Sequence, residues 1–152
     1  MQLINQMKIE FLSVPANVAF ARVVVASFAS QLDYTLSDLE EIKVAVSEAV
    51  SNAIIHGYEN APDKFVMVVA SLTKNALQIS VEDDGRGIED IKRALQPAFS
   101  TDPERMGLGF VFMQSFMDSF QVDSAPGRGT RVQMVKKVNT TVEQGSQVSP
   151  EH

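Results

Sequence analysis

Ser47-Glu48-Ala49-Val50-Ser51-Asn52 and, about thirty residues later, Glu82-Asp83-Asp84-Gly85-Arg86-Gly87-Ile88 are the stretches that decide the fold. In the first, Glu48 and Asn52 are four residues apart on a helical pattern, so their side chains share one helix face. The second places an acid and two glycines directly after a strand pattern. A second glycine pair follows at Gly107 and Gly109. Features in this order indicate a nucleotide pocket.

The helix that carries Glu48 is predicted from its apolar periodicity. Apolar residues recur at steps of three and four, at Leu39, Ile42, Val46, Ala49 and Ala53. Ser37-Asp38-Leu39-Glu40 has the spacing of a capping box, and Gly57 predicts the end of the helix. Glu48 and Asn52 lie roughly 100° or more from the apolar stripe, so we expect them to face a space beside the helix–sheet contact.

The rest of the chain predicts the element order β-α-α-β-β-lid-α-β-β. The expected segments are strand 7–11, helix 15–32 with Phe20, Val24 and Phe28 on one face, helix 37–56, hairpin 65–72 and 76–82, lid 85–109, helix 108–117, and strands 120–125 and 130–138. Because hairpins dominate the strand connections, we expect an α+β fold: a two-layer sandwich with a mixed, mostly antiparallel sheet and helices on one face.

Composition narrows the class of protein. Of 152 residues, 45% are hydrophobic and 21% charged, as is typical of a globular domain. The net charge of −6 argues against direct nucleic-acid binding, and the lack of cysteine excludes disulfides and thiolate metal sites. The apolar runs are too short to span a membrane and no secretion signal is visible, so we expect a cytoplasmic protein. Residues 1–138 are expected to form one domain and 139–152 a disordered tail.

The pair Glu48 and Asn52 combines a carboxylate with an amide. The carboxylate can accept a proton from an attacking hydroxyl group or orient a water molecule. The amide oxygen suits magnesium, a hard ion that prefers oxygen ligands. Taken alone, such a pair is more often part of a solvated helix face.

Asp83, Gly85 and Gly87 form a second candidate group. A glycine lets a ligand lie flat against the backbone, and a fixed carboxylate can accept the N–H of a base amino group. Taken alone, the stretch is equally consistent with an acidic turn after a strand. The glycines do not match a Walker A loop, and no Gly-x-Gly-x-x-Gly joins a strand to a helix.

Arg105, Gly107 and Gly109 form a third group at the start of a predicted helix. Backbone N–H groups at a helix start beside two glycines can bind an anion, and an arginine can add a charged fork to a terminal phosphate. Taken alone, the group is equally consistent with a helix entered through a flexible loop.

Together these groups resemble the motif series of the GHKL ATPases, which include gyrase, Hsp90, histidine kinases and MutL. The matching motifs are Glu48-x-x-x-Asn52, Asp83-x-Gly85-x-Gly87, Gly107-x-Gly109 and Gly129-Thr130. Four further stretches are similar to the bacterial anti-sigma F factors, serine-protein kinases of sporulation: Phe20-Ala21-Arg22-Val23, residues 47–58, Gln96-Pro97-Ala98-Phe99 and Phe116-Met117-Asp118. The resemblance covers residues 7 to about 138.

The resemblance implies a Bergerat-type ATP-binding fold that binds ATP or ADP with Mg²⁺, and it assigns a role to each matched residue. Glu48 would be the general base on the substrate serine, Asn52 the magnesium ligand, and Asp83 the adenine contact. The remaining assignments are Gly85 and Gly87 as walls of the base site, Gly107 and Gly109 on the phosphates, Thr130 near the adenine, and Arg105 on the γ-phosphate.

The resemblance also implies protein partners. The family acts as a homodimer that holds a sigma factor off RNA polymerase and phosphorylates an anti-anti-sigma protein on serine. Arg22 would belong to the surface that both partners share. Two alternatives remain open: an anti-sigma B type kinase of the stress response, and a nucleotide-dependent sigma-binding module with little kinase activity. Only a kinase needs Glu48 as a base.

Overall fold

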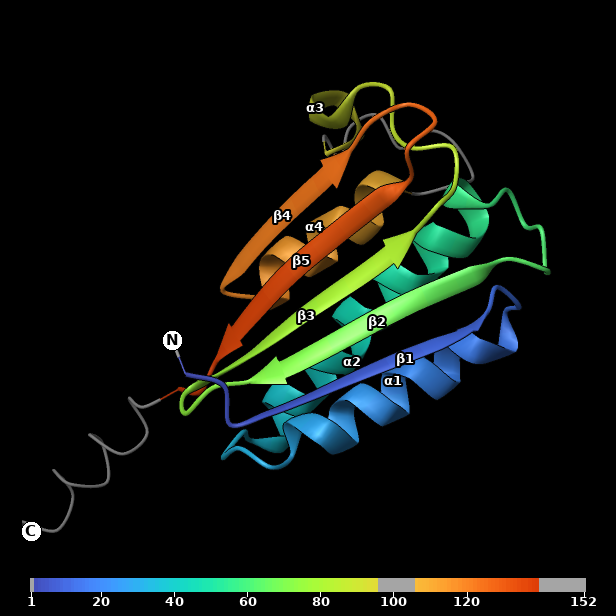
Figure 1. The fold of residues 1–152 in the computed structure, drawn as a ribbon. Coiled ribbons are helices and arrows are strands. Elements are labelled where there is room, and N and C mark those ends of the chain that lie inside the picture. The colour runs from blue at the N-terminus through green and yellow to red at the C-terminus, as the bar shows by residue number, and fades with distance from the viewer. Residues whose placement is uncertain (1, 96–105, 140–152) are drawn as a thin grey trace, which may run out of the picture.

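The computed structural model describes residues 2–95 and 106–139, which form an antiparallel sheet covered by helices on one face (Figure 1). The five strands lie in the order β1-β2-β3-β5-β4. Their bounds are Asn5–Leu12 (β1), Phe65–Leu72 (β2), Ala76–Asp83 (β3), Ser119–Ser124 (β4) and Thr130–Lys137 (β5). The predicted α+β two-layer fold is confirmed, and all four strand pairings are antiparallel where a mixed sheet was allowed.

Three long helices lie behind the sheet in the view of Figure 1. They are α1 (Ala16–Ala29), α2 (Leu36–Asn52) and α4 (Met106–Phe116), and a short helix α3 (Ile91–Ala94) lies beyond the end of β4. The core fills the space between the helices and the sheet. Its largest fully buried side chains include Ile42 of α2, Leu77 and Ile79 of β3, Phe110 of α4 and Met134 of β5. None of the helices within the described ranges is long and apolar enough to cross a membrane.

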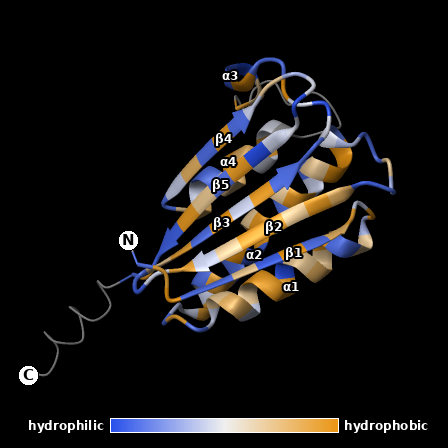
Figure 2. Cartoon of the chain, viewed as in Figure 1, coloured by the Kyte–Doolittle hydropathy of each residue, from blue (hydrophilic) through white to orange (hydrophobic). Residues whose placement is uncertain are grey.

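Among the described residues, no helix covers the opposite face of the sheet, and hydrophilic and hydrophobic residues alternate along several strands (Figure 2). In β3, Leu77, Ile79 and Val81 point into the core while Gln78 is exposed. One-sided burial of this kind is typical of an antiparallel sheet packed on a single helical layer.

Helix α1 buries a different face from the one predicted. Its buried residues are Ala21, Val25, Ala26 and Ala29, whereas Phe20 is 49% exposed. The Phe20 ring rests edge-on against Phe11 of β1, with ring centroids 6.2 Å apart. Periodicity alone favoured the larger residues Phe20, Val24 and Phe28. The correction has a packing cause, because small side chains at steps of four let α1 approach its neighbours closely.

The N-cap of helix α2 lies two residues earlier than predicted, and the helix begins at Leu36. Thr35, not Ser37, is the N-cap: the Asp38 backbone N–H donates to Thr35 Oγ1 at 3.0 Å, and the Thr35 N–H donates to Asp38 Oδ2 at 3.1 Å. This reciprocal pair is a capping box with an aspartate in the third position. Thr35 and Ser37 each fit the sequence pattern of an N-cap. The extended backbone of Thr35 identifies Thr35 as the residue that caps the helix.

At its other end α2 passes into a π-helical turn, η1 (Ala53–Gly57). The Tyr58 N–H donates to the Ala53 carbonyl at 2.9 Å, five residues back. A π turn inserts one extra residue and therefore rotates the residues after it, and such turns are frequent at functional sites. Here it brings His56 and Gly57 against the end of β3.

Candidate functional site

A pocket opens at the end of the sheet where β3 and β5 meet η1 and α4. It holds about 370 Å³ of space, part of it open to solvent. Its apolar lining includes Val81, Phe110 and Val132, and four polar residues line it as well: Asn52, His56, Asp83 and Thr130. An apolar lining with a few convergent polar groups is the usual form of a small-molecule site.

Asp83, the last residue of β3, is the buried carboxylate of this pocket and is 8% exposed. Its Oδ1 accepts the Gly85 N–H at 2.8 Å, and the Thr130 N–H also donates to the carboxylate. Burial raises the pKa of the Asp83 carboxyl to about 6, and the neighbouring charge of Asp84 acts in the same direction against the two N–H donors. These contacts fix the Asp83 carboxylate in place and leave it an oxygen that can accept a hydrogen bond from a ligand.

Gly57 and Gly85 form a thin wall behind this carboxylate. A β-carbon on Gly57 would lie 2.7 Å from the Asp83 carboxyl carbon, and one on Gly85 would lie 2.0 Å from the Gly57 carbonyl oxygen. Gly85 therefore supports Asp83 from behind and is absent from the residues that line the described pocket, whereas it was expected to wall the base. Gly57 was predicted only as the end of a helix, so its contact with Asp83 is an additional feature of the site.

Gly87 and Thr130 do line the pocket. Gly87 has a φ of +77°, and a β-carbon there would lie 2.0 Å from the Ala125 carbonyl oxygen, so only glycine fits without strain. The Thr130 hydroxyl is hydrogen-bonded to the Ser124 hydroxyl at 2.8 Å. The close approach of Gly87 to Ala125 joins the turn after Asp83 to the β4–β5 hairpin, and the Ile88 N–H strengthens this link by donating to Ser124 Oγ at 2.9 Å.

Glu48, Asn52 and Gly109 meet at the α4 side of the site. A β-carbon on Gly109 would lie 2.9 Å from Glu48 Oε1 and 3.3 Å from Asn52 Nδ2. The bare backbone of α4 thus lies against the two polar side chains of α2, and Gly107 is in the first turn of the same helix.

The Asn52 Nδ2 atom is buried and has no hydrogen-bond partner among the described residues. Buried polar groups are almost always paired, and an exception at a pocket points to a ligand. This amide and the side-chain-free backbone of Gly109 fit the phosphate end of a nucleotide.

Of the two candidate arginines, the structure describes Arg22 but not Arg105. Arg22 of α1 is half-buried, and its guanidinium donates to Ser47 Oγ at 3.4 Å, one residue before Glu48. Arg22 is not fully exposed because it borders the small-residue face of α1 and faces α2. Arg105 lies outside the described residues, as do the segment 96–105 and the tail 140–152.

Sequence reasoning also missed His56. It is 3% exposed and lines the pocket, and its carbonyl oxygen accepts the Arg86 Nε–H at 2.9 Å. The sequence analysis gave His56 no role at the site. The π turn changes the direction in which the side chains of residues 53–57 point, and a pattern of regular α-helical spacing does not predict that change.

The fold and the pocket define an ATPase domain of the histidine kinase type. Residues 11–136 match the family described as the histidine kinase-like ATPase domain. The structure resembles the RsbU and RsbW domains of Rv1364c from Mycobacterium tuberculosis (TM-score 0.62, 20% identity, 87% of this chain and 31% of that one). It also resembles the histidine kinase domain of a blue-light activated histidine kinase from Erythrobacter litoralis (TM-score 0.55, 19% identity, 83% of this chain and 61% of that one). These likenesses show a shared fold.

Closer relatives identify the particular family. The anti-sigma F factor of Thermoanaerobacter sp. (strain X514) is 49% identical over 142 residues, which cover 92% of this chain and 99% of that protein. The anti-sigma F factor of Clostridium kluyveri is 52% identical over 138 residues, which cover 90% and 96%. The chain belongs to the anti-sigma F factor family.

Proposed function

We propose that this protein sequesters a sporulation sigma factor and uses ATP to phosphorylate the matching anti-anti-sigma protein on serine. The observation that carries the proposal is the group of Glu48, Asn52 and Gly109 next to the Asp83 pocket. It places a carboxylate beside the backbone expected to hold phosphates, at the far side of a pocket suited to a base. The names of the relatives support a sigma factor as partner.

The nucleotide fits the site in one direction. The exocyclic N–H of adenine would donate to Asp83, Thr130 would lie close to the base, and the phosphates would extend toward Gly107 and Gly109 at the start of α4. Asn52 would be the protein ligand of a magnesium ion, which would neutralise phosphate charge when bound. Arg105 remains proposed for the γ-phosphate.

The chemical step is proposed as phosphoryl transfer to a serine hydroxyl. Glu48 accepts the hydroxyl proton while the serine oxygen forms a bond to the γ-phosphorus and the bond from that phosphorus to the β–γ bridging oxygen breaks. The products are phosphoserine, ADP and a protonated Glu48, which then loses its proton to water.

The protein partners are proposed to dock around Arg22. On the outer side of the same helix, Phe20 is 49% and Val23 is 58% exposed. Exposed apolar side chains beside an arginine are typical of interface anchors. The contact of Arg22 with Ser47 puts this surface next to Glu48, so a partner bound there can present a serine to the site. A homodimer, as the family resemblance implies, remains part of the proposal.

The test is incubation with labelled ATP, magnesium and the candidate anti-anti-sigma protein, followed by identification of the labelled residue. Label on serine is the expected result. Binding of sigma factor and ATP without transfer of label would support a nucleotide-dependent binding module and contradict the kinase proposal.

Nucleotide affinity is expected to rise between about pH 5 and 7. Only the ionised Asp83 carboxylate offers both oxygens as acceptors, and its pKa of about 6 lies within this range. Below that pKa, affinity should fall about tenfold per pH unit because binding must displace a proton. Asp83→Asn should bind more weakly throughout. The measurement is ATP titration of wild type and Asp83→Asn across this pH range. Ionisation of the phosphates affects both proteins alike, so a difference between their pH profiles reports on Asp83. Parallel pH profiles would contradict the role of Asp83 in adenine recognition.

Asn52→Ala is expected to reduce the gain in nucleotide affinity that magnesium provides. The substitution removes an amide oxygen that can bind the ion, while the Asp83 end of the pocket stays intact. ATP titrations with magnesium and with a chelator measure that gain in both proteins. Ser51→Ala, on the same helix but half-buried beside the site, is the control. An equal magnesium effect in wild type and Asn52→Ala would contradict the ligand assignment.

A further inference from the structure

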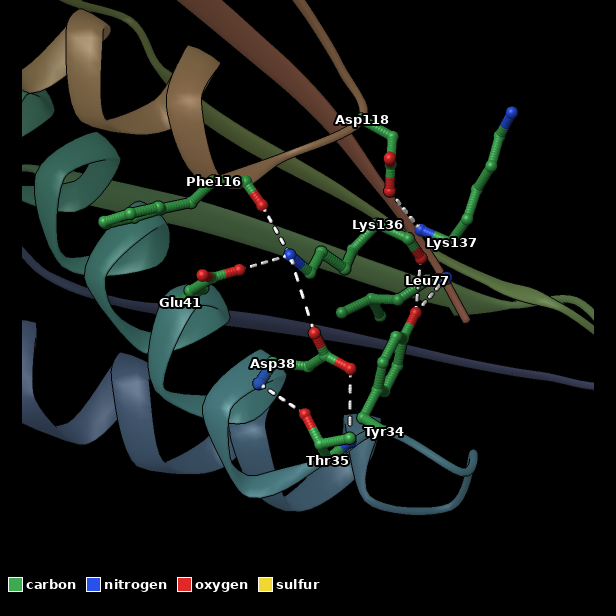
Figure 3. Close-up of polar contacts among 9 residues, drawn as sticks. All are labelled: Tyr34, Thr35, Asp38, Glu41, Leu77, Phe116, Asp118, Lys136 and Lys137. Atoms are coloured by element: carbon green, nitrogen blue, oxygen red, sulfur yellow. Dashed lines mark hydrogen bonds and ion pairs between the residues drawn. The ribbon is translucent and has the colours of Figure 1, made fainter. Parts of the chain in front are cut away.

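Lys136 lies at the end of the helical layer opposite the pocket and is 8% exposed (Figure 3). Its Nζ donates to Glu41 Oε1 of α2 at 2.6 Å and to the Phe116 carbonyl oxygen of α4 at 2.6 Å. Asp38 Oδ1, on the residue that closes the α2 capping box, is 4.0 Å away. One ammonium group thus joins β5, the first turns of α2 and the last residue of α4.

These contacts are stronger than those of a surface ion pair. A buried ammonium group requires charged or carbonyl partners, and removing one partner from such a pair is costly. The Phe116 carbonyl is also at the C-terminus of a helix, where the helix dipole favours a cation. Lys136 therefore fixes where α4 ends relative to α2.

Helices α2 and α4 run antiparallel, and contacts at their two ends define how α4 lies along α2. At the pocket end, the Gly109 backbone lies against Glu48 and Asn52. At the other end, Lys136 joins Phe116 to Glu41. Because a helix is stiff, a displacement of α4 at Phe116 moves Gly109 with it.

We propose that Lys136 is a positioning residue for the phosphate side of the nucleotide site. It holds α4 so that the start of this helix stays at the correct distance from Glu48 and Asn52, and it touches neither substrate nor nucleotide. This inference rests on the proposed function, in which the start of α4 binds the phosphates. The Asp83 side of the pocket comes from β3, η1 and β5, and the described part of α4 contributes only Phe110 to the lining, so base binding depends less on α4.

The test is the ratio of ATP affinity to adenosine affinity in Lys136→Met. We expect this ratio to fall by about 3- to 30-fold, the range in which substitutions away from a site change coupling. Adenosine affinity should change less than ATP affinity. A residue that only stabilises the fold would lower thermal stability without changing this ratio in the folded protein, so the ratio separates positioning from stability.

Lys137→Met is the matched control. Lys137 is the next residue of β5, its side chain is exposed, and its ammonium group points away from the cluster in Figure 3. The control removes the same charge and should leave the ratio unchanged. The double variant Lys136→Met with Glu41→Gln removes the partly exposed carboxylate that would lose its partner, so it provides the measurement if the single variant does not fold.

Two results with the variants would overturn this inference alone. One is an unchanged ratio in a folded Lys136 variant of a protein that binds ATP, which leaves the proposed function intact. The other is an equal fall of the ratio in Lys137→Met, which would assign the effect to net charge. A wild-type protein that binds ATP no better than adenosine would overturn the phosphate role of α4 in the proposed function, and this inference with it.

Discussion

Glu48→Gln should retain nucleotide binding and lower the rate of phosphoryl transfer by about 10² to 10⁴, the usual contribution of a general base. Glutamine keeps the shape of the side chain and its place beside Gly109, where Oε1 lies 2.9 Å from the position of a β-carbon. An amide cannot accept the serine proton, so the loss should appear in kcat while ATP affinity is nearly unchanged. Single-turnover transfer of label to the anti-anti-sigma protein, with a separate ATP titration, measures both.

Glu40→Gln is the control for this result. Glu40 is on the same helix, its side chain is 69% exposed, and it pairs with Lys43 at 3.0 Å. Surface pairs of this kind contribute little to stability, so the control should transfer phosphate at the wild-type rate. Turnover of Glu48→Gln within about tenfold of wild type would mean that positioning of the phosphate, rather than proton transfer by Glu48, provides most of the rate enhancement.

The fold was largely predictable because most of its elements have strong local patterns. The apolar stripe of α2 and the alternation of β3 are both buried as expected, since each element faces a single core. Helix α1 shows where this reasoning fails. Its largest side chain on the expected face, Phe20, is half-exposed, because contact with α2 selects small residues and local periodicity does not report a neighbouring helix.

The site was predictable to the extent that its residues are close in sequence. Asp83 at the end of β3 follows from strand alternation and the glycines after it. The placement of Gly57 against Asp83 depends on a π turn, and the placement of Gly109 against Glu48 depends on the packing of α4 on α2. These are contacts between residues at least 26 positions apart, which only the folded structure brings together.

Arg22→Glu should abolish binding of both protein partners while ATP binding is retained. Arg22 is next to the exposed Val23 on α1 and donates to the Ser47 hydroxyl of α2, so a charge reversal there changes the proposed docking surface. Loss of a central interface arginine typically costs at least about 2 kcal/mol, or about 30-fold in affinity. The nucleotide pocket is lined by other elements and should be unaffected. Binding of sigma factor, anti-anti-sigma protein and ATP to a single preparation measures all three.

Lys8→Glu provides the same reversal of charge elsewhere. Lys8 is exposed on β1 between Met7 and Ile9, which pack against the core, so its side chain lies on the other face of the sheet. The variant should bind both partners as wild type does. If Arg22→Glu captures both partners undiminished, Arg22 is not part of the docking surface. If only one partner is lost, the two proteins do not share this surface. Because Arg22 contacts the residue before Glu48, loss of both partners with ATP binding intact would show that docking and phosphoryl transfer use adjacent faces of α1 and α2.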